Sequence, residues 1–276
     1  MAITAQDVNK LRKMTGAGMM DCKKALTESD GDFEKAIDIL RKKGQKVSAS
    51  RADRETSEGS VFVKTNDANT EGVIVALNCE TDFVGKNDDF LGLGKQILEV
   101  AYEKNPASIE ELLAMPLGNL TVADKITELV GKIGEKIEIS AYVRLTADQV
   151  VPYIHAGNKL GVLVGLSNTN GTDATEAGKD VAMQIAAMNP ISVSRNEVPQ
   201  NIIDREMEIG REQARAEGKP EQMLDKIAEG KLNKFFAEST LLAQKFVKDN
   251  SLTIEKYLDG VSKGLTVSKF ERISIG

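Results

Sequence analysis

The sequence predicts an α+β protein with a three-helix N-terminal unit, a linker, two related sheet-and-helix units and a projecting antiparallel helical hairpin. Three observations predict this class. Apolar residues recur at helical spacing in several segments, short aliphatic runs typical of buried strands lie between them, and one glycine-led strand pattern occurs twice. With 41% hydrophobic and 28% charged residues among 276, the composition is that of a globular protein of roughly two domains. Aromatic residues make up only 4%, so the core must be aliphatic.

Residues 1–44 are expected to form three short helices. Thr4 with Asp7 three residues on resembles a capping box, and glycines and an Asp-Gly turn then separate three apolar runs of helical spacing. Two lysines followed by Gly44 predict the end of the third helix. The polar stretch over residues 45–60 lacks periodicity, which predicts a linker that is partly helical.

Two strand-and-helix units are expected next, one over residues 61–140 and one over residues 141–196 with 238–276. Gly72–Leu77 and Gly161–Leu166 are both glycine-led aliphatic runs, each followed by a helix that ends near Asn-Pro, and we interpret them as a weak internal repeat. Strands are expected at about 61–63, 72–78, 137–145, 151–156, 160–166 and 265–275. Helices are expected at about 88–103, 109–115, 122–133, 175–188 and 253–258.

Residues 197–237 are expected to form an antiparallel coiled-coil hairpin with two helices of about 20 residues. Gly218-Lys219-Pro220 predicts the turn between them. The seam of the first helix steps by 4, 3 and 4 residues, through Ile203, Met207, Gly210 and Ala214. The seam of the second helix is expected to contain Met223, Ile227 and Phe235.

Composition argues against several classes of function. The net charge of -6 and the pI of about 5.2 disfavour non-specific binding to nucleic acid or to anionic membranes, although residues 1–50 hold 10 basic and 7 acidic side chains. A single histidine and two distant cysteines predict neither a metal site nor a Ser-His-Asp triad, and no cofactor is expected. Without an apolar N-terminal segment or a long apolar run, a cytoplasmic location is expected.

Two short motifs each allow a structural and a functional interpretation. The pair Met19-Met20 after a glycine-rich turn either fills the core of a small bundle or forms a flexible apolar tip that docks on a partner. In Thr81–Val84, which follows a buried strand, Phe83 either packs on the sheet or stands exposed as a wedge. A hydrolase that uses Asp82 with Cys79 is the enzyme alternative, although a buried structural thiol is the simpler interpretation of Cys79.

At this point the chain resembles a known family. Leu11–Leu26, read LRKMTGAGMMDCKKAL, closely resembles the opening signature of bacterial elongation factor Ts, and Asn78–Val84, read NCETDFV, resembles its second signature. Lys132–Glu135 and His155 with Gly161–Val164 follow in the family's order, so the resemblance covers nearly the whole chain.

The resemblance implies a non-enzymatic guanine nucleotide exchange factor for the translation GTPase elongation factor Tu, which it binds both with GDP and without nucleotide. It also implies that residues 1–44 are a ubiquitin-associated-like fold. Residues Thr81–Val84 are implied to displace magnesium from the partner. The implied contacts with the GTPase are made by Arg12, Met19, Met20, Thr81, Asp82, Phe83, Val84, Ile133, Gly134 and the region around His155.

Some questions stay open at this level. The chain is compatible with a homodimer or with a heterotetramer with the GTPase, and the hairpin is either a dimer interface or an arm. The family often has a further C-terminal module that also contacts the GTPase, whereas this sequence ends soon after its last expected strand, so that contact is not predicted. A third hypothesis takes residues 1–50 alone as a peptide-binding or ubiquitin-binding module.

Overall fold

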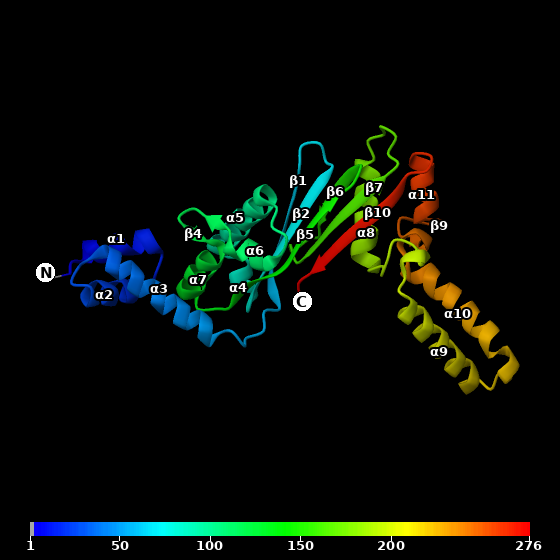
Figure 1. The fold of residues 1–276 in the computed structure, drawn as a ribbon, viewed down its shortest axis with the longest axis horizontal. Helices are drawn as coiled ribbons and strands as arrows, with labels where there is room; N and C mark the ends of the chain where they lie inside the picture. Colours follow the sequence, from blue (N-terminus) through cyan, green and yellow to red (C-terminus); the bar gives the residue numbers. More distant parts are fainter. Residues whose placement is uncertain (1–2) are drawn as a thin grey trace.

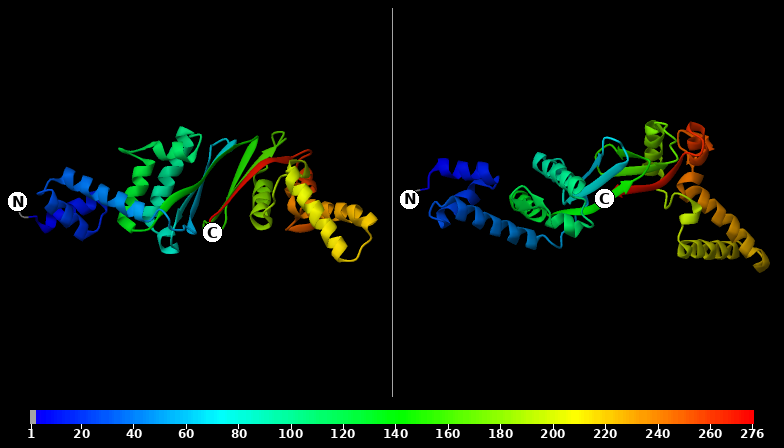
Figure 2. Two further views of the ribbon diagram at one scale, coloured as in Figure 1. Left: turned by 60° about the horizontal axis from the view of Figure 1, so that its bottom comes forward. Right: turned by 45° about the horizontal axis from the view of Figure 1, so that its top comes forward.

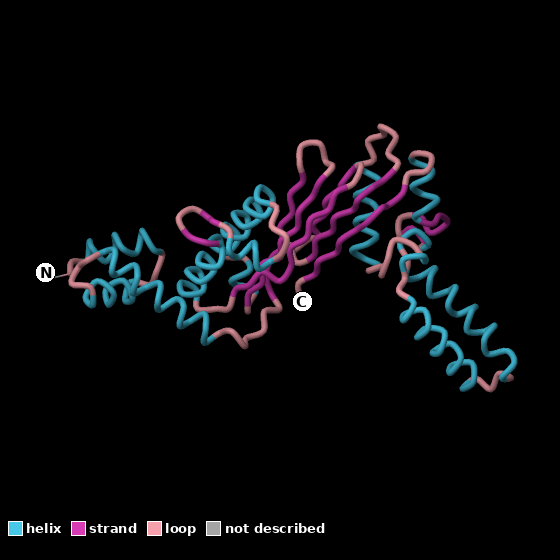
Figure 3. The backbone as a smooth tube through the Cα atoms, in the orientation of Figure 1, coloured by secondary structure: helices cyan, strands magenta, loops and turns pink. Residues whose placement is uncertain are grey.

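The chain forms an elongated molecule, with a helical unit at the N-terminal end, β-sheets in the middle and a helical hairpin at the far end (Figures 1 and 3). The computed structural model describes residues 3–276. Its mixed helices and sheets confirm the predicted α+β class. The division into domains at the expected boundaries stays a prediction.

Three helices open the chain: α1 (Ala5–Thr15), α2 (Met19–Glu28) and α3 (Phe33–Ser50). The capping box at the start of α1 is confirmed, because the Thr4 hydroxyl accepts from the amide of Asp7 at 3.2 Å and the Asp7 carboxylate accepts from the amide of Thr4 at 3.0 Å. The core of this unit is small and consists of Val8, Leu11, Cys22, Ala25, Leu26 and Ala36.

The predicted end of α3 at Gly44 is wrong, since the helix continues to Ser50. Gly44 is buried where α3 crosses α7 (Val122–Ile133), and a Cβ on Gly131 of α7 would lie 2.7 Å from the Cα of Gly44. The glycine therefore allows close helix packing and does not stop the helix. The expected linker is partly helical as predicted, and Thr56 near its end is held against the first sheet, because Asn78 Nδ2 donates to the carbonyl of Thr56 at 2.9 Å.

Two three-stranded antiparallel sheets form the middle of the molecule, with strand orders β1-β2-β5 and β10-β7-β6. The strands of the first sheet are β1 (Glu58–Thr65), β2 (Glu71–Cys79) and β5 (Ile137–Thr146). The strands of the second sheet are β6 (Gln149–Ile154), β7 (Leu160–Ser167) and β10 (Thr266–Ser274). All six were expected from the sequence, within a few residues at each end.

The two sheets pack against each other, and helices cover their outer faces. Along β2, Val73, Val75 and Leu77 face the first layer of helices, whereas Ile74 and Ala76 face the second sheet, as the two-residue period of a strand requires. The helices on the first sheet are α5 (Asp88–Lys104), α6 (Ile109–Ala114) and α7. The helices on the second sheet are α8 (Thr175–Met188) and α11 (Ile254–Val261).

The glycines that lead the repeated strand pattern both lie between the sheets. A Cβ on Gly72 would lie 2.9 Å from side-chain atoms of Leu163 and Val150, and a Cβ on Gly161 would lie 2.6 Å from Val61. Close contact between the sheets accounts for a glycine at these two corresponding positions.

The hairpin consists of α9 (Gln200–Ala216) and α10 (Leu224–Ser239), which project away from the sheets in every view (Figure 2). Gly210 and Ala214 are buried in the seam as predicted. The predicted seam of the second helix is wrong by one position, because the buried residues are Leu224, Ala228 and Phe236. A Cβ on Gly210 would lie 3.0 Å from the Cα of Ala228. The close approach of these two small residues therefore determines which face of α10 packs against α9.

Several short elements were not predicted, because runs of two to five residues carry no clear period. They are α4 (Asp82–Gly85), β3 (Pro116–Leu117), β4 (Leu120–Thr121), β8 (Lys245–Phe246), β9 (Asp249–Thr253) and three 3-10 turns. Over residues 3–276, no helix combines the length and the apolar character needed to cross a membrane.

Candidate functional site

The turn after β2 presents an aromatic side chain to solvent. Phe83, in the four-residue helix α4, is 82% exposed, which is the largest value among the exposed large hydrophobic residues of the described chain. Its neighbour Val84 is 7% exposed and packs in the core with Cys79 and Phe90. The interpretation that Phe83 packs on the sheet is therefore wrong. The turn is anchored by Val84, whose side chain is buried in the core.

Thr81 begins this turn, and its polar groups bind a residue far away in the sequence. Its hydroxyl donates to Glu135 Oε1 at 2.7 Å and its amide donates to Glu135 Oε2 at 3.0 Å. Glu135 comes directly after Gly134, which ends α7 with a φ of 85°, and after the half-buried Ile133. The structure thus brings Thr81–Val84 together with Ile133 and Gly134.

A second carboxylate joins the same turn to the end of α3. Glu80 Oε1 accepts from the amide of Lys136 at 2.7 Å, and the guanidinium of Arg51 lies 3.3 Å from Glu80 Oε2. Because Arg51 follows α3, Glu80 connects the three-helix unit, the end of β2 and the start of β5.

A groove of about 520 Å³ lies beside the turn, between α4 and the β6–β7 turn. Asp82 is exposed at its edge, where Lys86 lies 2.7 Å away and lowers the pKa of the Asp82 carboxyl through a hydrogen bond. Ala156 and its neighbours form the opposite wall. His155 is exposed at the start of that turn, and its Nδ1 is 2.8 Å from the Tyr153 hydroxyl. The region around His155 therefore borders the same groove as Asp82.

The methionine pair of the first signature is also exposed, at a different place. Met19 is 51% and Met20 is 74% exposed at the start of α2, and Arg12 is exposed on α1, so the interpretation of the pair as core filling is wrong. Helices α1 and α2 lie at one end of the molecule, whereas α4 lies beside the first sheet (Figure 1). The structure does not bring the methionines and Phe83 together.

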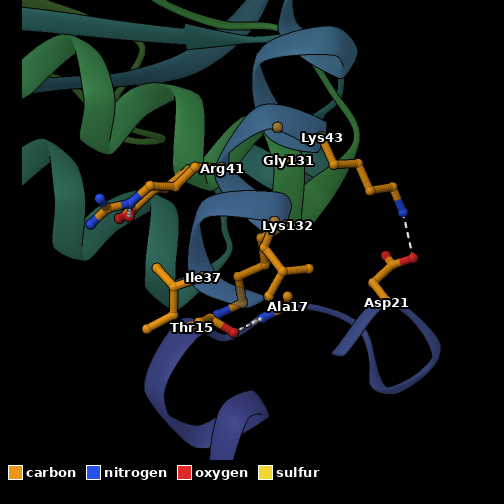
Figure 4. A pocket seen from close by; sticks show the side chains of 11 residues that line it. Thr15, Ala17, Asp21, Ile37, Arg41, Lys43, Gly131 and Lys132 are labelled. Atoms are coloured by element: carbon orange, nitrogen blue, oxygen red, sulfur yellow. Dashed lines mark hydrogen bonds and ion pairs between the residues drawn. The ribbon is translucent and has the colours of Figure 1, made fainter. Parts of the chain in front are cut away.

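The three-helix unit contacts the rest of the chain mainly where α3 packs against α7. A cavity of about 50 Å³ lies between the α1–α2 loop, α3 and α7, and Figure 4 shows Thr15 and Arg41 among the side chains that line it. Beside it, Arg41 of α3 lies 3.5 Å from Glu128 of α7. A partly exposed ion pair of this kind contributes little to stability, so the position of the unit depends mainly on the packing of this one helix against α7.

The enzyme alternative loses its nucleophile in this structure. Burial, together with the nearby Glu135 carboxylate, raises the pKa of the Cys79 thiol to about 12. A thiol must ionise to act as a nucleophile, so Cys79 is inert at neutral pH. Within residues 3–276, no group of three or more His, Cys, Asp and Glu side chains is arranged to hold a metal ion.

Comparison with known proteins agrees with the two signatures. A family model described as "Elongation factor TS" matches residues 80–276. The elongation factor Ts of Amoebophilus asiaticus is 57% identical over 276 residues, the full length of both chains. The chain belongs to the elongation factor Ts family. The family members of Cytophaga hutchinsonii and Porphyromonas gingivalis are 61% and 52% identical, each over at least 99% of both chains.

Membership of the elongation factor Ts family confirms the resemblance and gives the chain a role in translation elongation. The family model begins at residue 80, whereas the relatives named above extend over the three-helix unit as well.

Sequence reasoning assigned no role to Glu135. A local signal for it exists in the capping pattern. Thr4 and Thr121 each have Asp three residues later, and both form capping boxes, but the third residue after Thr81 is Val84. Thr81 therefore lacks the local carboxylate that closes the other two capping boxes, and in the structure Glu135 accepts from its amide and hydroxyl in that role.

Proposed function

We propose that this chain is a guanine nucleotide exchange factor for elongation factor Tu. It binds the GTPase with GDP, disturbs the magnesium and phosphate site, and releases GDP so that GTP can bind. The observation that carries the proposal is the exposure of Phe83. This large apolar side chain is 82% exposed, on a turn that is fixed by the hydrogen bonds between Thr81 and Glu135. Exposed aromatic anchors of this kind are typical of the residues that dominate protein interfaces.

In this proposal the Phe83 turn acts at the magnesium site of the partner. Phe83 and Asp82 contact the partner helices beside the magnesium, Thr81 and Val84 hold the turn in place, and Ile133-Gly134 borders the same contact. Displacing the magnesium leaves the phosphate charges of GDP without compensation, which weakens GDP binding. The chain itself makes and breaks no covalent bond.

The three-helix unit and the β6–β7 turn supply further contacts. Arg12, Met19 and Met20 grip the nucleotide-binding domain of the GTPase, and the region around His155 meets its third domain. Methionine suits such a surface because its flexible, polarizable side chain adapts to the shape of the partner. Spreading the contacts lets the chain hold the GTPase while the Phe83 turn changes the nucleotide site.

Nucleotide exchange requires that the chain bind the nucleotide-free GTPase more tightly than the GDP-bound GTPase. By linkage, the chain weakens GDP binding by the same factor by which GDP weakens binding of the chain. A 10³-fold effect corresponds to about 4 kcal/mol. Burying one phenylalanine fully contributes about 1.5–3 kcal/mol, so Phe83 alone is insufficient and the distributed contacts are needed.

The proposal is tested by stopped-flow release of a fluorescent GDP analogue from elongation factor Tu, with calorimetry on the GDP-loaded and the nucleotide-free GTPase. We expect faster release at saturating concentrations of the chain and tighter binding to the nucleotide-free form. Equal affinity for the two forms would contradict exchange activity. Strong binding by residues 1–50 alone would instead favour the peptide-binding hypothesis, which places the whole interaction in the three-helix unit.

A further inference from the structure

The turn that carries Phe83 has little support of its own. Helix α4 spans four residues, and within it the amide of Gly85 donates to the carbonyl of Thr81 at 3.1 Å. The Thr81 side chain makes no local capping hydrogen bond. A four-residue helix is far too short to be stable alone. A side chain as apolar as Phe83 also gains free energy by leaving water, so a loosely held turn would relax to cover it.

Glu135 supplies the missing support from 54 positions away. Its two carboxylate oxygens accept separately from the hydroxyl and the amide of Thr81, at 2.7 and 3.0 Å. Two hydrogen bonds to one charged group fix both the position and the orientation of the residue that donates them. Glu80, the residue before Thr81, is itself fixed by the amide of Lys136 and by Arg51.

We propose that Glu135 is a positioning residue for nucleotide exchange, which holds Thr81 so that Phe83 stays exposed and aimed at the partner. This inference rests on the exchange function proposed above. Glu135 acts through Phe83 and needs no contact with the GTPase. Glu80 assists by joining the same turn to the end of α3, so the turn and the three-helix unit share one anchor.

The elements on either side of Glu135 are complete without its carboxylate. Helix α7 is ended by Gly134, whose amide donates to the carbonyl of Val130 at 2.7 Å, and β5 begins its pairing at Ile137. Loss of the Glu135 side chain therefore frees Thr81 at the start of the Phe83 turn and leaves both α7 and β5 in place. This separation makes Glu135→Ala informative, because its effect is local.

The first test measures GDP release from elongation factor Tu as a function of the concentration of the chain. Hydrogen bonds to a charged group are strong enough that we expect Glu135→Ala to lower the maximal rate about tenfold. Glu135→Gln, which keeps an acceptor oxygen, should recover part of the loss. In a Phe83→Ala background, Glu135→Ala should have no further effect, because the side chain that it positions is gone.

The matched control is Glu71→Gln, which changes another half-buried carboxylate, at the start of β2, where it pairs with Arg144. We expect Glu71→Gln to leave the maximal rate unchanged. An equal loss in Glu71→Gln, or effects of Glu135→Ala and Phe83→Ala that multiply in the double variant, would overturn the positioning role.

The second test needs no partner. Because the chain has no tryptophan, Phe83→Trp places a single indole on the turn. With Glu135 intact we expect red-shifted emission, and adding Glu135→Ala should lower the fluorescence anisotropy or shift the emission to the blue. Unchanged anisotropy and emission would overturn the inference. This result is independent of exchange, so a chain that fails to release GDP would refute the proposed function while the fluorescence still decides whether Glu135 holds the turn.

Discussion

Phe83 and the Met19-Met20 pair both expose large apolar side chains, but the chain holds them in opposite ways. The Phe83 turn is held on the large core of the first sheet by the buried Val84 and by the two hydrogen bonds that Thr81 donates to Glu135. The methionines lie on a unit with a small buried core, which contacts the rest of the chain through one helix, α3. Helix α3 crosses α7 at Gly44 and Gly131, packs Val47 on the first core, and pairs Arg41 with Glu128 and Arg51 with Glu80.

This difference indicates that the two surfaces have different roles: the Phe83 turn forms a firm contact, held in a fixed position, and the Met19-Met20 surface forms an adjustable contact, whose position can adapt to the partner. A side chain that must deform a partner needs a rigid base, because a loose base would move in place of the partner. A side chain that only grips can sit on a unit whose position adapts, and methionine is suited to that task. We therefore expect changes at the Phe83 turn to affect the maximal rate of GDP release and changes at the three-helix unit to affect apparent affinity.

The largest effect is expected from Phe83→Ala. An aromatic anchor at the centre of an interface contributes at least about 2 kcal/mol, so the maximal rate of GDP release should fall roughly 30-fold. The melting temperature should not fall, because the side chain is 82% exposed in the free chain. The control is Val247→Ala, a residue 51% exposed in the second half of the chain. An unchanged rate in Phe83→Ala would remove Phe83 from the exchange mechanism.

A smaller effect is expected when the three-helix unit is displaced. A Cβ at Gly131 would lie 2.7 Å from the Cα of Gly44, so Gly131→Ala forces α3 away from α7. The concentration of chain that gives half-maximal exchange should rise about tenfold, since a displaced unit weakens several contacts together. The maximal rate should change much less, because Glu135 and Val84 still hold the Phe83 turn when Arg51 moves with α3.

Gly92→Ala is the matched control for Gly131→Ala, because Gly92 is also helical and nothing lies within 4 Å of its Cβ position. It should leave both kinetic parameters unchanged. A fall in the maximal rate of Gly131→Ala, without a change in the half-maximal concentration, would show that the unit is not an adjustable grip.

Met20→Ala should have a smaller effect again. Met20 is 74% exposed, and its partial burial against a partner would account for about a fivefold rise in the half-maximal concentration. Met223→Ala, at a methionine 44% exposed on the hairpin, is the control and should change nothing. Loss of maximal rate in Met20→Ala would place the methionine in the firm contact with Phe83.

The sequence predicted the positions of the long helices and strands well, but it predicted poorly which side chains are exposed and how the helices contact one another. Helices 122–133 and 175–188 were predicted to the residue, because helical periodicity and the left-handed residues that end them, Gly134 and Asn189, are local signals. Gly44 and the seam of α10 were misjudged, since both depend on a glycine that lets another helix approach. The family resemblance supplied the candidate residues, but whether Phe83 and Met20 are exposed depends on tertiary packing that no local pattern encodes.

The smallest effect on exchange is expected from Cys79→Ala. This variant tests whether the buried thiol of Cys79 helps to hold the Phe83 turn in place. Cys79 Sγ donates to the carbonyl of Thr81 at 3.2 Å, and burial raises the pKa of its thiol from 9.0 to about 12. A raised pKa in the folded state means that the folded chain favours the protonated thiol. The resulting contribution to stability is complete below about pH 9 and is lost as the pH rises toward 12.

Urea unfolding at a series of alkaline pH values measures this contribution. The free energy of unfolding of Cys79→Ala, taken relative to its own value at pH 7, should fall less steeply above pH 9 than that of the unchanged chain. Tyr257→Phe is the comparison in the second half of the chain, because burial raises the pKa of Tyr257 to about 12 as well. If Cys79→Ala and the unchanged chain lose stability in parallel while Tyr257→Phe does not, the thiol is not part of the firm base, and the rigidity of the Phe83 turn must come from Glu135 and Val84 alone.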